Sequence, residues 1–156
     1  MAKIMDKSYL YNYASQALNR ARDLQSQISQ IDLDIRFQQL SNHSSFAGVS
    51  DSLRLNYLQS QKLNLISQRD SYVSDATSYA IELLLDEMNH DVSGYLSLGA
   101  MLINNIQSFL SVYDINARIS VVARYKLAEL SYKLAVPSFS YMDVATKVEN
   151  LKRRLN

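Results

Sequence analysis

The chain has 156 residues, of which 47% are hydrophobic and 20% are charged, and its formal net charge is +1. This length suits one domain with a buried core, and this hydrophobic content argues against wholesale disorder. Three glycines and one proline leave few turn-forming residues, which disfavours an all-β fold. The absence of cysteine excludes disulfides and thiolate chemistry. We predict one all-α domain over residues 1–156.

The first helix is predicted over residues 6–41, because apolar residues recur at alternating spacings of four and three, the heptad pattern of a coiled coil. The residues with this spacing are Leu10, Ala14, Ala17, Ala21, Leu24, Ile28, Ile31 and Ile35. Turn-forming residues follow in the segment NHSSFAGVSDS, where the chain is expected to bend.

A second heptad pattern predicts a helix over residues 51–90, antiparallel to the first. Its seam runs through Leu55, Leu58, Lys62, Leu65, Arg69, Tyr72, Ala76, Tyr79 and Leu83. Lys62 and Arg69 interrupt this seam, and we expect both side chains to lie along the groove with their charges in water. The alternative for Lys62 is an ion pair with Asp32 at the edge of the seam, which would fix the register.

The third predicted helix, residues 95–113, lies in a run that holds no charged residue from 92 to 113. The run is about as long as a membrane span, but Asn104, Asn105 and Gln107 make a lipid-facing span costly. We expect the hairpin to cover one face of this helix and another subunit or another protein to cover the other. The candidate interaction residues on this helix are Leu102, Asn104, Ile106, Ser108 and Phe109.

Two further helices are predicted at 115–135 and 141–155. Asp114 is a candidate cap for the first, and Pro137 follows its end. Ser140 and Asp143 resemble a capping box for the second, and Gly94 is a candidate end of the 51–90 helix. The expected fold is an elongated helical bundle, built on a long antiparallel coiled-coil-like hairpin (6–90) with three shorter C-terminal helices (95–156).

Charge is distributed unevenly between these parts. Residues 1–114 hold 8 Lys and Arg against 12 Asp and Glu, a net −4, whereas residues 115–156 hold 8 against 3, a net +5. The C-terminal part has a candidate basic patch for nucleic acid, flanked by tyrosines but interrupted by Glu129. We favour a solvated face for these residues, which are Arg118, Arg124, Lys126, Lys152, Arg153 and Arg154.

Candidate chemistry is sparse. Glu87 and His90 have the spacing found in two-metal helical bundles, but a dinuclear site needs a second such pair, and the chain has only two histidines. A single-ion site that also uses Asp86 and Asp91 is the remaining alternative to a solvated acidic helix end. His43 lies among serines that we interpret as turn and cap residues, not as a catalytic set. We expect no catalytic, cofactor or metal site.

The bend carries the better candidate for function. Leu33, Phe37 and Leu40 form an apolar stripe that points away from the seam, and Phe46 and Val49 follow it. Apolar groups at the end of a long hairpin need cover, either from the C-terminal helices or from a partner.

These features predict a non-enzymatic structural or assembly protein. It is expected to form a homo-oligomer or to join a larger complex, such as a virion, a secretion apparatus or a filament. The alternatives are a secreted or membrane-active helical protein whose uncharged helix inserts, and a nucleic-acid-binding bundle. The N-terminal MAKIMDKSYLYNYASQ lacks the apolar core of a secretory signal, so we expect a cytoplasmic or virion-associated protein, with signal-less secretion left open.

Overall fold

The computed structural model describes residues 7–42 and 49–156. Helix α1 (Ser8–Asn42) and helix α2 (Val49–Asn89) pack against each other as a long antiparallel hairpin. At about 1.5 Å per residue they are roughly 52 and 62 Å long. Their bounds lie within two residues of those predicted, so the hairpin is confirmed.

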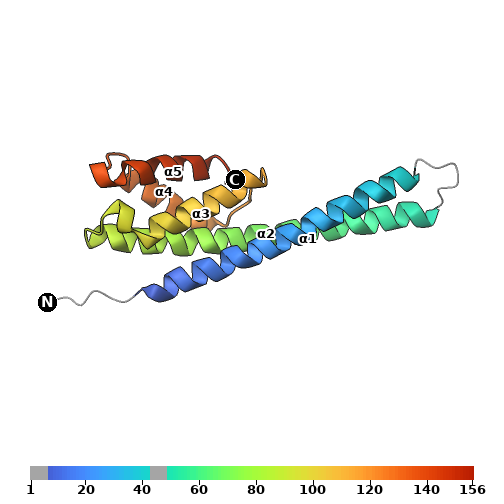
Figure 1. Ribbon diagram of the computed structural model, residues 1–156, viewed down its shortest axis with the longest axis horizontal. Helices are drawn as coiled ribbons and strands as arrows, with labels where there is room; N and C mark the ends of the chain where they lie inside the picture. Colours follow the sequence, from blue (N-terminus) through green and yellow to red (C-terminus); the bar gives the residue numbers. More distant parts are fainter. Residues whose placement is uncertain (1–6, 43–48) are drawn as a thin grey trace.

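The C-terminal part lies along one half of this hairpin, over α2, and leaves the other half as two helices alone (Figure 1). It consists of η1 (Gly94–Leu96), α3 (Leu98–Val112), α4 (Val121–Lys133), η2 (Phe139–Tyr141) and α5 (Met142–Lys152). The elongated all-α fold is therefore as predicted. We call the half that extends past the C-terminal helices the distal hairpin, residues 27–42 and 49–66.

The main core lies where the C-terminal helices cover α1 and α2. Small residues of the α1 seam, such as Ala14 and Ala21, are fully buried and let α2 approach closely. Larger side chains fill the space between α2, α3, α4 and α5; these include Ile81, Leu84, Ile103, Leu110, Leu130 and Leu151.

The predicted start of the fourth helix is wrong. Residues 115–120 are not helical, and Ala117 forms an isolated parallel bridge with Leu155. Asp114 has a positive φ of 51° and caps nothing; the helix begins at Val121, where Ser120 Oγ accepts a hydrogen bond from Ala123 N at 3.1 Å. Pairing with the distant C-terminus, which leaves no local pattern, overrides the helical spacing here.

The predicted caps around Gly94 and Ser140 are also wrong, and the two residues meet each other instead. Ser140 Oγ accepts a hydrogen bond from Gly94 N at 3.3 Å, and no side chain caps α5. A Cβ atom on Gly94 would lie 1.9 Å from the carbonyl oxygen of Ser140. Gly94 thus serves a close backbone contact, while α2 ends earlier, at Asn89.

Lys62 and Arg69 do not extend into water as expected. Lys62 Nζ lies 2.6 Å from Asp32 Oδ1, so the alternative ion pair is the one formed. Arg69 is only 7% exposed and its guanidinium lies between the two helices. The seam contains a buried charge at this level of the hairpin.

Candidate functional site

A buried polar layer separates the main core from the distal hairpin. Arg69 Nη1 donates to Gln25 Oε1 at 2.9 Å, and Arg69 Nη2 donates to Asp70 Oδ1 at 2.9 Å. Asp70 Oδ2 in turn accepts from Arg118 N at 3.1 Å, which ties the segment before α4 to α2. Each buried charge therefore has partners, and the layer marks the level at which the C-terminal part ends.

Beyond this layer no other helix of the described part of the chain packs on these two helices. Their shared core is a small cluster made by Ile31, Ile35 and Leu58, with Leu55 and Leu65 half-buried beside it. This contact between two helices buries much less apolar surface than the main core does. The distal hairpin is consequently the part of the fold that gains most from a further covering layer.

The predicted bend stripe is exposed on this distal hairpin. Phe37 and Leu40 are 68% and 69% exposed, and Leu33 is also exposed, on the side of α1 away from Ile31 and Ile35. We call Leu33, Phe37 and Leu40 the distal stripe. No C-terminal helix reaches it, since those helices lie over the other half of the hairpin (Figure 1). Internal cover by the C-terminal helices, the alternative left open by the sequence, is not formed among residues 7–42 and 49–156.

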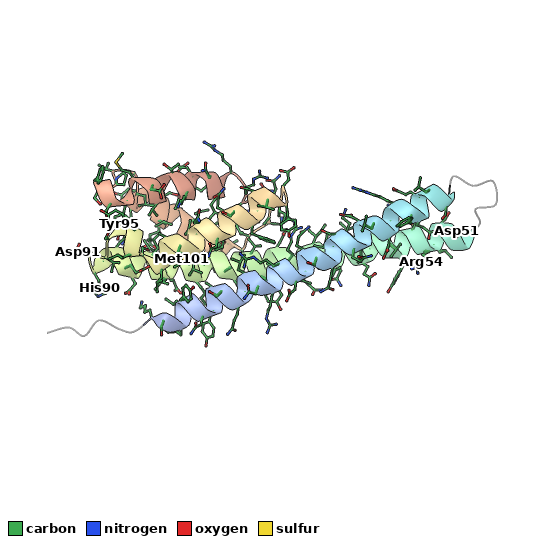
Figure 2. All side chains as sticks on the ribbon, viewed as in Figure 1. Asp51, Arg54, His90, Asp91, Tyr95 and Met101 are labelled. Atoms are coloured by element: carbon green, nitrogen blue, oxygen red, sulfur yellow. The ribbon has the colours of Figure 1, made fainter. Side chains whose placement is uncertain are left out.

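Helix α2 adds exposed apolar side chains of its own. Leu53 and Tyr57, one turn apart, are exposed on the side away from Leu55 and Leu58. Asp51 and Arg54, close to them in sequence, lie at the far end of the hairpin (Figure 2). Phe46, the other predicted bend residue, lies outside the described residues, and Val49 is described only as the first residue of α2.

The uncharged helix is part of the chain's own core. Leu102, Ile106 and Phe109 are buried, because α3 packs on α2 and α1 and is covered by α5. Asn104 is half-buried and Ser108 is exposed. The three apolar residues therefore offer no surface to a second subunit. Cover by the chain's own helices explains the missing charge on this face only, because Met101 and Val112 on the other face are exposed and also uncharged.

The candidate basic patch divides into two groups, and half of it is paired. Lys126 pairs with Glu82 at 3.0 Å, Lys152 with Glu149 at 3.4 Å, and Arg154 with Asp114 at 2.6 Å.

The three remaining patch residues, Arg118, Arg124 and Arg153, are exposed. The bridge between residues 117 and 155 brings the C-terminal backbone beside the segment that holds Arg118, through a hydrogen bond from Ala117 N to Arg154 O at 2.8 Å.

The acidic end of α2 has a structural role. Glu87 accepts hydrogen bonds from the backbone N–H groups of Leu98 and Gly99, at 2.8 and 2.7 Å. Asp86 lies 3.6 Å from Lys7 Nζ and 3.7 Å from His90 Nδ1. Within the described ranges, no group of three or more His, Cys, Asp or Glu residues has the arrangement of a metal site.

Tyr141 lies beside this acidic end, and its surroundings shift its pKa. Its hydroxyl donates a hydrogen bond to the carbonyl of Val92. Burial raises the pKa of this phenol, and the negative charges of Glu87 and Asp91 raise it further. The tyrosine stays neutral and holds the loop after α2 against η2.

A cavity of about 460 Å³ lies between α2 and the segment before α4. Its polar wall is engaged in holding that segment: Ser74 Oγ accepts from Ser120 N at 2.9 Å, and Asp70 accepts from Arg118 N. No histidine lines this cavity. Its geometry is that of a junction between two elements, without an acid and base aimed at a common point.

A second exposed apolar surface was not predicted. Helix α4 buries Ala123, Leu127 and Leu130, yet its opposite face is apolar as well. That face carries Val121, Tyr125, Ala128 and Tyr132, all exposed, and we call these four residues the α4 outer seam. The signal was present in the sequence as a 4-3-4 spacing, but it overlaps the inward-facing pattern.

Helices of the described part of the chain do not combine the length and the apolar character needed to cross a membrane. Comparisons with protein families, with curated proteins and with solved structures give no match to this chain.

Proposed function

We propose that this chain is a non-enzymatic structural protein that self-associates, or docks into a larger complex such as a virion, a secretion apparatus or a filament, through helical surfaces. The observation that carries this proposal is the distal stripe. Three large apolar side chains, Leu33, Phe37 and Leu40, lie in line on a projecting hairpin and are exposed. Such contiguous apolar patches mark interaction surfaces in soluble proteins.

The energetics favour contact at this place. Covering a large apolar side chain stabilises an interface by about 1.5–3 kcal/mol when burial is complete. Phe37 and Leu40 stand on a helix whose other face is already fixed by Ile31 and Ile35, so little ordering entropy is lost on docking. A rigid rod that presents an apolar stripe at one end suits repeated contacts between subunits.

Sedimentation velocity of a double variant, Phe37→Asp with Leu40→Asp, tests the proposal. We expect the native chain to sediment as an assembly and this variant to lose the contact made by the distal stripe. Both side chains are exposed, so circular dichroism and thermal unfolding are expected to stay native. Gln27→Asp with Gln30→Asp is the matched control, because it adds the same two charges at exposed positions of the same helix. Equal sedimentation of native chain and Phe37/Leu40 variant would refute the proposal.

A further inference from the structure

Helix α4 is apolar on two opposite faces. The inner face packs on α2 and buries Leu127 and Leu130. On the outer seam, Tyr125 and Tyr132 are 78% and 84% exposed, and Val121 and Ala128 are exposed beside them. An ordinary surface helix presents polar residues on this side, so the outer seam is fitted to a contact that the single chain does not make within its described residues.

The spacing of the outer seam identifies the shape of its partner. Val121, Tyr125, Ala128 and Tyr132 follow one another at intervals of four, three and four, which is the d-a-d-a pattern of a heptad seam. Residues with this spacing all contact a second helix only when the axes of the two helices are nearly aligned. In a parallel, in-register pair each seam residue faces its own copy, so Tyr125 and Tyr132 each pack against the same tyrosine of the partner subunit, where offset ring stacking is favourable.

The flanking charges identify the partner as a second copy of α4, in parallel orientation. In the same register, Arg124 occupies position g and Glu129 position e. In a parallel pair of helices, a g residue lies beside the e residue five positions later on the other helix. Arg124 therefore meets Glu129 of the partner subunit, and two-fold symmetry forms this ion pair twice.

An antiparallel pair has no such complement. It brings g beside g and e beside e, which places Arg124 near Ser131 and Glu129 near Val122 of the other copy. Both Arg124 and Glu129 are exposed, and neither has an ion-pair partner among residues 7–42 and 49–156. We propose that the α4 outer seam forms a parallel, two-fold symmetric dimer, an inference that rests on the proposed assembly function and names a second copy as the partner.

The geometry of the dimer follows from the way α4 lies on α2. Ser120 bonds to Ser74, and Lys126 pairs with Glu82, so α4 runs in the same direction as α2. The two-fold axis of a parallel dimer runs along α4, and it is therefore nearly parallel to the hairpin as well. Both distal hairpins of a dimer project toward the same end, where each keeps its distal stripe available for contacts with other dimers.

Cysteine cross-linking tests the orientation, because the chain has no native cysteine. In the parallel dimer, Val121→Cys lies beside its own copy and forms an intermolecular disulfide under mild oxidation. An antiparallel pair moves residue 121 next to residue 132, about 16 Å away along the helix, and prevents that bond. Ser108→Cys, exposed on α3, is the matched control and stays uncross-linked. No cross-link at 121, or an equal one at 108, overturns the proposal.

Charge reversal provides the second test, read as the dimer dissociation constant from sedimentation equilibrium. Arg124→Glu alone and Glu129→Arg alone each juxtapose like charges twice and are expected to raise the constant on the order of tenfold or more. The double reversal restores opposite charges and native affinity. A double variant that is no tighter than the single variants overturns the parallel register.

These tests are independent of the test of the distal stripe. The Phe37/Leu40 variant is expected to keep the disulfide at residue 121, because the outer seam is untouched. A chain that associates through the distal stripe but forms no cross-link at residue 121 would refute this inference alone. An α4 dimer whose further association is unchanged by Phe37→Asp with Leu40→Asp would refute the distal contact alone.

Discussion

Glu87, at the end of α2, accepts a hydrogen bond from the backbone N–H of Gly99, in the first turn of α3, at 2.7 Å. The same carboxylate accepts from Leu98 N and from the hydroxyl of Ser97. The first N–H groups of a helix have no partner within the helix, and the helix dipole makes this end positive. A carboxylate here accepts hydrogen bonds from those N–H groups and complements the positive end of the dipole. One acidic side chain thus ties the first turn of the uncharged helix to the end of the hairpin.

Glu87→Ala is expected to lower the free energy of unfolding by about 1–2 kcal/mol, because the N–H groups of Leu98 and Gly99 lose their acceptor. Glu87→Gln, which retains one oxygen, is expected to cost less. Urea denaturation of the three proteins provides the comparison. An alanine variant as stable as the native chain would show that water caps α3 equally well.

Gly99 allows α3 to lie directly on the backbone of α2. A Cβ atom at this position would lie 2.5 Å from Leu84 N and 2.7 Å from Leu84 Cα. Gly99→Ala is therefore expected to separate the helices and to cost about 1–3 kcal/mol of stability, even though alanine has the higher helix propensity. Ser108→Ala, on the exposed side of α3, is the control and should be neutral or stabilising. Thermal unfolding of both variants decides, and an unchanged midpoint for Gly99→Ala would contradict the close packing.

The raised pKa of Tyr141 predicts that the stability of the fold depends on pH. The pKa of an unfolded tyrosine is about 10, and burial together with Glu87 and Asp91 raises it in the folded state. The stability that this neutral hydroxyl contributes is fully present below pH 10, and it is lost as the pH rises through the higher folded pKa.

Tyr141→Phe is accordingly expected to cost about 1 kcal/mol at pH 7, because the Val92 carbonyl loses its donor. The difference between native chain and variant should shrink above about pH 10. Denaturation of both proteins from pH 7 to 11 measures it, and a difference that stays constant or grows with pH would be inconsistent with the raised pKa.

Arg69 is expected to be the most sensitive charged residue of the hairpin. Arg69→Ala leaves Gln25 without its donor and Asp70 without its counter-charge, at a cost of about 3 kcal/mol. Lysine is expected to rescue only partly, because an ammonium group does not reproduce the planar guanidinium fork. Arg54→Ala, at an exposed position of α2, serves as the control. Chemical denaturation that shows equal, small effects at both sites would contradict a structural role for the buried layer.

The long hairpin was predictable because its heptads are local. Every residue of the α1 seam from Leu10 to Ile35 is buried as its spacing indicates. Arg69 occupies a seam position too, but its burial depends on Gln25, 44 residues earlier in the chain. The heptad pattern of α2 alone does not reveal whether α1 places a hydrogen-bond partner opposite Arg69.

Other features depend on tertiary contacts that leave no periodic signal. The extended segment at 115–120 exists because Ala117 pairs with the C-terminal backbone. Glu87 and His90 matched a metal-ligand spacing, whereas Glu87 serves as a cap for α3. Cover of α3 by α5 made an apparent interface stripe into core. Exposure of the distal stripe followed from the absence of any third helix over the distal hairpin in the described part of the chain.

Absolute mass by light scattering behind size exclusion, over a wide range of concentrations, tests self-association most directly. One chain has a mass of 17.8 kDa. We predict a mass above this value that increases with concentration, and that falls when Phe37→Asp and Leu40→Asp are introduced. A constant mass of one chain at every concentration would contradict the account.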